Sequence, residues 1–348
     1  MRSVFWEDNQ LKMIDQRILP ARFEIVAYRS HREVAQAIKD MVVRGAPAIG
    51  AAAAFGLALA GYESASASAR ELLADLQAAA NTLKASRPTA VNLAWAVDRI
   101  LHTVKKSGQQ NADELRQLLL TEAQHIADED VAINKRMAEH GAALINDGDT
   151  VIHHCNTGAL ATVDWGTALG VIRTAHEQGK RVHVLVDETR PRLQGARLTA
   201  WELEHYGIPY EIISDNMAGY FLKTGSVQKC FVGSDRTAAN GDVANKIGTY
   251  MLALAAYDNG VPFYPVVPTS TIDLSLASGE QIPIEERNPE EVLGIQFLGE
   301  PVAPKNAKAR NPAFDVTPNR LVTGIVTENG IAYPPFDVNL KKLVVKNS

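Results

Sequence analysis

Residues 150–158 read TVIHHCNTG, a short β-rich run that ends in a turn containing glycine. Similar apolar, β-rich runs follow at 181–186, 209–213, 229–232 and 261–267, and segments of helical character separate them. Strands that alternate with helices predict right-handed βαβ units and a parallel sheet. We therefore predict an α/β protein with a Rossmann-like, doubly wound domain over residues 149–348, in which helices flank the sheet.

The residues before this pattern predict a mainly helical domain over residues 1–148. Helical spacing extends over 31–43, 68–85, 91–104 and 111–145, with one short strand expected at 23–28. Ser30 and Glu33 have the spacing of a capping box. Residues 46–62, APAIGAAAAFGLALAGY, carry no charge but are short for a bilayer span. Because Ala and Gly favour close packing, we predict a buried helix there and no membrane partner.

The composition excludes several classes of protein. The 348 residues are 46% hydrophobic and 22% charged, as in an ordinary soluble protein. The net charge of −5 argues against a general polyanion surface, so we expect no nucleic-acid partner. Two cysteines exclude a disulfide framework and a four-cysteine zinc site. The first ten residues show no secretory signal, which predicts a cytoplasmic protein.

Cofactor motifs are absent from the sequence as well. It contains neither G-x-G-x-x-G nor a P-loop motif, so a tightly bound dinucleotide or nucleotide is unsupported. His153 and His154 are adjacent and point to opposite faces of a strand, so they cannot converge on a metal with Cys155. We expect no cofactor and no metal.

Ligands of open parallel sheets bind at the carboxyl ends of the strands. Cys155 follows the first strand, before a turn that we expect to open a helix, and a helix N-terminus favours a thiolate or a bound anion. The alternative is a buried structural cysteine, which is our interpretation of Cys230 in mid-strand. The polar segments at the other strand ends are 187–190, 214–216, 233–236 and 268–270.

Asp235 is the second candidate for chemistry. It follows a buried strand in a segment rich in turn formers, and an acid among apolar neighbours can act as a general acid or base. The alternative is a pair with Arg236 or a turn cap. Three other acids share the position at the strand ends, and spacing alone does not choose among them: Asp187, Glu188 and Asp215.

Cations for an anionic ligand are also present. Lys246 lies beside Asn245 in a helix predicted over 243–257. Arg44 and Arg87 occupy turns that break helices, although most arginines in turns are simply solvated.

Eight motifs in order carry a resemblance to a known family. The motifs are RGAPAIG (44–50), SRPTAVNL (86–93), HCNTGALAT (154–162), DETRPRLQGARLTAWEL (187–203), DNMAGY (215–220), GSDRTAANGDVANKIGTY (233–250), IPIEER (282–287) and NPAFDVTP (311–318). With them the chain resembles the methylthioribose-1-phosphate isomerases of methionine salvage, which share a superfamily with regulatory subunits of a translation-initiation exchange factor. The resemblance extends from about residue 20 to residue 330.

The resemblance implies a role for individual residues. Cys155 resembles the catalytic cysteine of the family and Asp235 its catalytic acid. Ser234 and Thr237 depart from the family pattern, in which Ala and a larger apolar residue are expected. The family also implies a homodimer. The positions that match sugar-phosphate binding are Arg44, Gly45, Ala46, Arg87, Gln194, Asn245 and Lys246.

The resemblance therefore implies an aldose–ketose isomerase, and two alternatives stay open. One is an isomerase of ribose 1,5-bisphosphate, which would need a second cationic subsite. The other is a non-catalytic regulatory subunit that binds a sugar phosphate or a nucleotide, although such a module has no need of both a thiol and an acid. Transfer of hydrogen by hydride shift or through an enediol also stays open.

Overall fold

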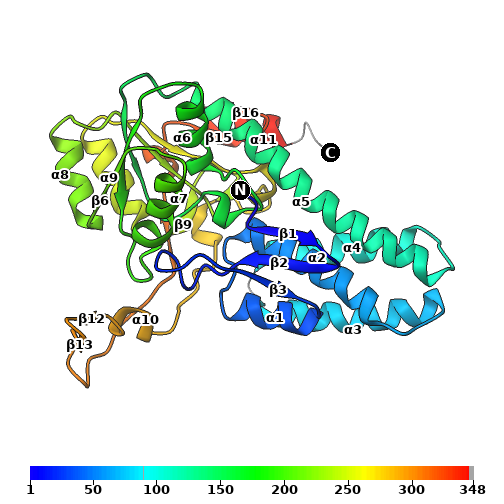
Figure 1. The fold of residues 1–348 in the computed structure, drawn as a ribbon. Helices are drawn as coiled ribbons and strands as arrows, with labels where there is room; N and C mark the ends of the chain where they lie inside the picture. The colour runs from blue at the N-terminus through cyan, green and yellow to red at the C-terminus, as the bar shows by residue number, and fades with distance from the viewer. Residues whose placement is uncertain (89, 345–348) are drawn as a thin grey trace. The chain divides into compact units, whose positions relative to one another are not determined.

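Five parallel strands form the sheet that the sequence predicts. The structure is a computed structural model that describes residues 1–88 and 90–344, traced from blue to red in Figure 1. The strand order is β10-β7-β4-β5-β6, so the first predicted strand is central. The strands are β4 (Thr150–His153), β5 (His183–Asp187), β6 (Tyr210–Ile213), β7 (Lys229–Val232) and β10 (Phe263–Pro265). The predicted α/β class and parallel sheet are confirmed.

Helices connect these strands, as βαβ units require. The helical segment between β5 and β6 begins with one π-helical turn, η2 (Gly195–Thr199), and continues as α7 (Ala200–His205). The other connecting helices are α6 (Ala168–Glu177), α8 (Ala218–Lys223) and α9 (Thr249–Asp258). Ile152, Cys230 and Phe263 are fully buried in the apolar core of this part.

The prediction of a helix over 243–257 is wrong for its first residues. Residues Val243–Lys246 form strand β9, which pairs with β8 (Arg236–Ala238) on one side and β14 (Phe314–Thr317) on the other. Helix α9 starts only after Gly248, whose φ of +102° is left-handed. The Asp315 carboxylate accepts hydrogen bonds from the N–H groups of Gly248 (2.7 Å) and Tyr250 (3.1 Å) and so caps the helix.

The N-terminal part is mainly helical, as predicted, and it also holds a three-stranded antiparallel sheet. Two of its strands were not predicted, β1 (Val4–Glu7) and β2 (Gln10–Ile14); the third, β3 (Ile25–Tyr28), was. The capping box of Ser30 and Glu33 is confirmed at the start of α1. The helices are α1 (His31–Lys39), α2 (Ala46–Glu63), α3 (Ala69–Ser86), α4 (Val91–Lys106) and α5 (Ala112–Ala142).

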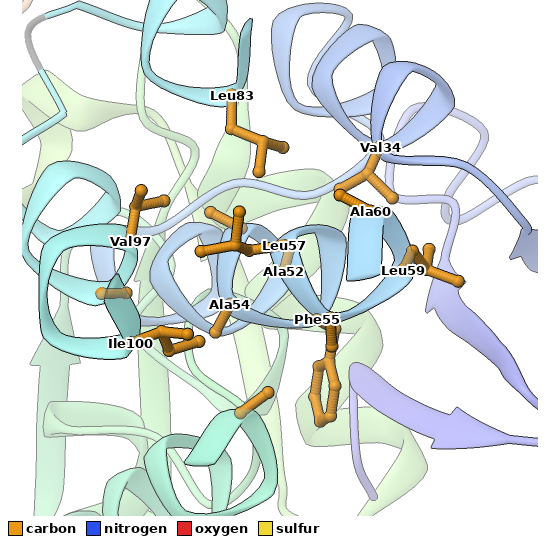
Figure 2. Close-up of a cluster of buried hydrophobic side chains, with 14 of the residues drawn as sticks. Val34, Ala52, Ala54, Phe55, Leu57, Leu59, Ala60, Leu83, Val97 and Ile100 are labelled. Atoms are coloured by element: carbon orange, nitrogen blue, oxygen red, sulfur yellow. The ribbon is translucent and has the colours of Figure 1, made fainter. Parts of the chain in front are cut away.

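Helix α2 is the centre of the N-terminal core. It is long and apolar enough to cross a bilayer, but 78% of its 18-residue window is buried inside the protein. Figure 2 shows its side chains surrounded by residues of α1, α3 and α4, among them Val34, Leu83 and Ile100. A helix that is apolar on all sides is typical of a core, and the prediction of a buried helix is confirmed.

The chain divides into two compact units, and each is formed from two segments. One consists of residues 1–133 and 158–166, and the other of residues 134–157 and 167–348. The predicted division into a domain of residues 1–148 and a domain of residues 149–348 stays a prediction.

The remaining elements are short. A late strand begins at Ile325, after a 3-10 turn. The C-terminal connections contain β11 (Ile272–Asp273), α10 (Glu290–Leu293), β12 (Gln296–Phe297), β13 (Glu300–Pro301), β15 (Ile325–Thr327), β16 (Gly330–Ala332) and α11 (Phe336–Val344). The 3-10 turns are η1 (Ala159–Ala161), η3 (Asp215–Met217), η4 (Thr269–Thr271), η5 (Gly279–Gln281) and η6 (Asn319–Leu321).

Candidate active site

Cys155 lies at the carboxyl end of the central strand β4, in a strained backbone conformation. Its φ is +69°, in the left-handed region that L-residues rarely adopt, and its side chain is almost buried. Its N–H donates to the Thr189 hydroxyl at 2.9 Å, and its carbonyl accepts from the Thr199 hydroxyl at 2.7 Å. Such strain costs on the order of 1–3 kcal/mol and persists only where neighbours hold the backbone, as these two threonines do.

The prediction that the turn after Cys155 opens an α-helix is wrong. Only the three-residue 3-10 turn η1 follows, and the next α-helix, α6, begins at Ala168. The Leu169 N–H of that helix donates to the Thr157 hydroxyl at 3.1 Å. The turn of Cys155 is therefore shaped by hydrogen bonds from neighbouring loops.

The segment after strand β5 carries both threonines that bond to Cys155. Asp215 accepts hydrogen bonds from the N–H groups of Thr189 and Arg190, each at 2.7 Å. A Cβ at Gly195 would lie 1.7 Å from the Asp187 carbonyl oxygen, so only glycine allows the chain to fold back this closely. Gln194 is buried just before it, and its Oε1 has no hydrogen-bond partner among the described residues. That oxygen is available to accept a hydrogen bond from a ligand hydroxyl.

Asp235 lies in the turn between β7 and β8. Its N–H donates to the Ala244 carbonyl at 2.9 Å, and its side chain is exposed. The neighbouring Arg236 guanidinium lies 3.5 Å from Asp273. Ser234 and Thr237, which depart from the family pattern, bond to each other through their hydroxyls at 2.9 Å.

Asn245 and Lys246 are buried on strand β9, one strand away from Asp235 in the same hairpin. The Lys246 ammonium donates to the Ala313 carbonyl at 2.7 Å and lies 4.5 Å from the centre of the Phe314 ring. The Asn245 amide donates to the Thr249 hydroxyl at 3.0 Å. Both side chains are thus fixed by a strand rather than by the predicted helix.

The loops that carry Cys155 and Asp235 lie side by side. Strands β4 and β7 are neighbours in the sheet, with His153 opposite Phe231. A Cβ at Gly233 would lie 2.7 Å from the Thr157 side chain. The His154 ring also reaches the segment after Lys246, because its Nε2 lies 2.9 Å from the Ile247 carbonyl oxygen. The loops at the carboxyl ends of β4 and β7, with the segment after β8, therefore lie close together. They carry Cys155, Asp235, Asn245 and Lys246.

Arg44, Gly45, Ala46 and Arg87 belong to the other compact unit. Gly45 precedes helix α2 with a φ of +89°, and a Cβ there would lie 2.1 Å from the Ala161 carbonyl oxygen. The N–H groups of the first turn have no side-chain cap at Gly45, which suits an anion. Arg87 follows helix α3 and is half-buried. Their place in the same site as Cys155 stays a prediction.

Two adjacent histidines have opposite environments. Burial lowers the pKa of His153 to about 4, and its Nδ1 donates to the Phe231 carbonyl at 2.9 Å. The pKa of His154 is raised, because a hydrogen bond and the charge of Asp187 outweigh the desolvation that lowers it. Burial also raises the pKa of the Cys230 thiol, in keeping with a structural cysteine.

The structure adds a group that the sequence interpretation did not assign. His154, Asp187 and Asp215 each place one ligand-type atom within 4.8 Å of the others. Both ring nitrogens of His154 already lie at hydrogen-bond distance from protein acceptors, which makes the group a hydrogen-bonded cluster. Asp187, Thr189 and Asp215 stood out in sequence by their position at the strand ends, whereas no role was assigned to the Thr199 hydroxyl.

Comparison with known proteins identifies the family of the chain. Residues 42–334 match the model of the Initiation factor 2 subunit family. The chain is 54% identical to the methylthioribose-1-phosphate isomerase of a Synechococcus species, over 99% of this chain and 98% of the relative. It is also 54% identical to the methylthioribose-1-phosphate isomerase of Thermosipho africanus, over 97% and 96% of the two chains.

Solved structures show the same likeness. The crystal structure of 5-methylthioribose 1-phosphate isomerase from Pyrococcus horikoshii has a TM-score of 0.94 and 48% identity, covering 99% of this chain and 96% of that one. A structure described as translation initiation factor eIF-2B, subunit delta, from A. fulgidus has a TM-score of 0.91 and 46% identity, covering 99% of both chains. The chain therefore belongs to the Initiation factor 2 subunit family and, within it, to the methylthioribose-1-phosphate isomerases.

Proposed function

We propose that the chain converts 5-methylthioribose 1-phosphate, an aldose, into 5-methylthioribulose 1-phosphate, a ketose, as the isomerase of methionine salvage. The observation that carries this function is identity of about half over nearly the full length to several methylthioribose-1-phosphate isomerases. The chain is an intramolecular oxidoreductase, since the sugar is oxidised at C2 and reduced at C1.

Cys155 and Asp235 are the proposed catalytic residues. Their loops meet at the edge of the sheet where parallel folds bind ligands, which supports the assignment. Lys246 and the N-terminus of α2, with Arg44, Gly45 and Ala46, offer positive charge and N–H groups to the phosphate. The remaining proposed substrate-binding residues are Arg87, Gln194 and Asn245.

The substrate dictates the first chemical step. Because phosphate occupies the anomeric oxygen, the sugar ring cannot open as a free aldose does. Asp235 donates a proton to the ring oxygen as its bond to C1 breaks. A hydride then moves with its electron pair from C2 to the electron-deficient C1. The C2 hydroxyl gives its proton to the Asp235 carboxylate as the ketone forms, so that Asp235 is an acid again and the proton count balances. The thiol of Cys155 stabilises the charge that develops at these carbons.

We assign the transfer from C2 to C1 to a direct hydride shift, which a site closed to water would favour. Substrate deuterated at C2 tests this route, because a hydride shift retains the label at C1 of the product. Complete loss of the label to water would show instead that a base removes the C2 proton and an enediol forms.

Substitution of the two catalytic residues tests the site. We expect Cys155→Ala to abolish measurable turnover and Asp235→Asn to lower kcat by about 10²–10⁴-fold, the usual contribution of a general acid. Cys230→Ala is the matched control, since that thiol lies in mid-strand in the core. Wild-type turnover in Cys155→Ala would remove the thiol from the mechanism without affecting the assignment of the reaction.

The alternatives are separable by substrate and by assembly. Ribose 1,5-bisphosphate carries a second phosphate, which would need another cationic subsite. Faster turnover of this sugar than of the methylthio sugar would show that it is the substrate. The likeness to an eIF-2B delta subunit makes a regulatory role the second candidate. A protein that binds the sugar phosphate but turns over neither substrate would support that role.

We also propose a cytoplasmic homodimer that binds neither nucleic acid nor membrane. The family resemblance supports the dimer, and the net charge of −5 and the buried helix α2 support the absence of those two partners. Sedimentation equilibrium should give about twice the chain mass of 37.8 kDa. A monomer at micromolar concentration would contradict the proposed assembly.

A further inference from the structure

The His154 ring is buried between two hydrogen-bond acceptors. Its Nδ1 lies 2.8 Å from Oδ2 of Asp187, on the neighbouring strand β5, and its Nε2 lies 2.9 Å from the Ile247 carbonyl oxygen. Both side chains of the pair are about 1% exposed. A Cβ at Gly248 would lie 2.8 Å from the ring, so the chain passes directly against it.

These partners fix the number of protons on the pair. A carbonyl only accepts, so Nε2 must carry a hydrogen. A proton must also lie between Nδ1 and the carboxylate, either on the ring or on Asp187. The pair thus holds two protons and no net charge in both arrangements. Removal of one would set two lone pairs against each other in a buried site, or would leave the Ile247 carbonyl without its donor.

Other charges around the ring are consistent with this proton count. Asp215 follows β6, Asp315 lies on β14, and their negative charges face His154; Lys246 on β9 and His153 on β4 are the nearby bases. Burial raises the pKa of Asp187, and the hydrogen bond from His154 opposes that shift. The pKa of His154 is also raised. Both directions favour retention of the second proton.

The ring connects two segments that the proposed function uses. Cys155 is the next residue along β4, and Ile247 follows Lys246 directly. Gly248, beside the ring, is held on its other side by the Asp315 carboxylate. A shift of the imidazole would therefore move the turn after Lys246 relative to the turn of Cys155.

We propose that His154 is a positioning residue which, with Asp187, keeps a proton at each ring nitrogen through the working pH range and ties the Lys246 turn to the Cys155 turn. The expected effect on catalysis rests on the proposed function. The number of protons held by His154 and Asp187 can be tested without any activity. It assigns a function to a buried pair that touches neither the proposed thiol chemistry nor the acid.

Histidine-selective NMR of the whole protein is the first test. The chain has nine histidines, and His154 is identified by the signal lost in His154→Gln. We expect its ring signals to stay constant from about pH 6 to about pH 9. A His154 signal that moves with pH across this range would overturn the proposal, whether or not the enzyme turns over.

Two substitutions of Asp187 form a matched pair for the kinetic test. Asp187→Asn keeps a donor for Nδ1 and leaves the Nε2 hydrogen for Ile247, whereas Asp187→Ala removes the partner. We expect kcat/KM to fall by about threefold or less in Asp187→Asn and by about tenfold or more in Asp187→Ala, chiefly through KM. Equal losses in both variants, at matched thermal stability, would overturn the proposal.

Discussion

At the scale of single residues, the site depends on backbone conformations that only neighbours can hold. Cys155 and Thr189 both have positive φ, +69° and +64°, although neither is glycine. The Thr189 hydroxyl accepts from the Cys155 N–H and donates to the Asp187 carbonyl, so one side chain fixes both turns. Strain of this kind at a thiol is a common property of functional sites.

The Thr189 hydroxyl should therefore be required for activity. Thr189→Val keeps the shape and removes the hydroxyl, leaving the Cys155 N–H without its acceptor, and we expect kcat to fall by about tenfold, equivalent to the loss of one buried hydrogen bond. Thr189→Ser keeps the hydroxyl and should retain most of the activity. Steady-state kinetics of the two variants decide the point, and a serine variant as impaired as the valine variant would show that the methyl group matters instead.

His153 should make the protein less stable in acid. Its pKa is lowered to about 4, so the folded state keeps it neutral while the unfolded chain binds a proton below its ordinary value of 6.5. Stability contributed by this residue should fall as pH drops from about 6.5 to 4, by up to about 1.4 kcal/mol per pH unit. His153→Asn, whose amide can still donate to Phe231, should flatten the dependence of urea unfolding on pH. Exposed His102→Asn should not, and an unchanged slope in His153→Asn would contradict the assignment.

At the scale of elements, the local sequence pattern was sufficient to place a strand or helix whose own residues are mostly apolar. The five strands and helix α2 are continuous apolar runs, and their positions were predicted within a few residues. Strand β9 was not, because it continues in sequence into helix α9, with Gly248 between them, and one of its two pairing partners, β14, lies far along the chain. The β1–β2 hairpin did carry a local signal, the Asp8–Asn9 turn with two positive φ angles, typical of a tight hairpin.

Phe55 is the side chain of helix α2 whose loss should cost most. It is fully buried, and it stacks on Trp6 with ring centroids 6.1 Å apart. Phe55→Ala should lower the free energy of unfolding by about 3–5 kcal/mol through lost burial and a cavity. Phe297→Ala is the control, since that ring is 69% exposed and should cost less than about 0.5 kcal/mol. Urea titrations followed by circular dichroism compare them, and similar midpoints would contradict the core role of α2.

At the scale of the whole molecule, the order of the chain does not follow its division into units. Residues 158–166 directly follow the strand and turn of Cys155, yet they belong with residues 1–133. Val163 is buried in that core, and its carbonyl accepts from the Ser3 N–H at 2.9 Å. The sequence pattern predicted that the turn after Cys155 opens a helix, because no local feature shows that nine residues belong to the other unit.

Destabilisation should therefore follow the units and not the sequence. Val163→Ala removes two buried methyl groups from the core around α2, and we expect a cost of about 1–3 kcal/mol. Amide hydrogen exchange followed by mass spectrometry should then show faster exchange in β1 and β2, with β5 and β7 little changed. Val151→Ala, a buried position in β4 only twelve residues earlier, is the matched control and should loosen β5 and β7 instead. Faster exchange of β5 and β7 in Val163→Ala would mean that chain proximity, not the division of the core, governs local stability.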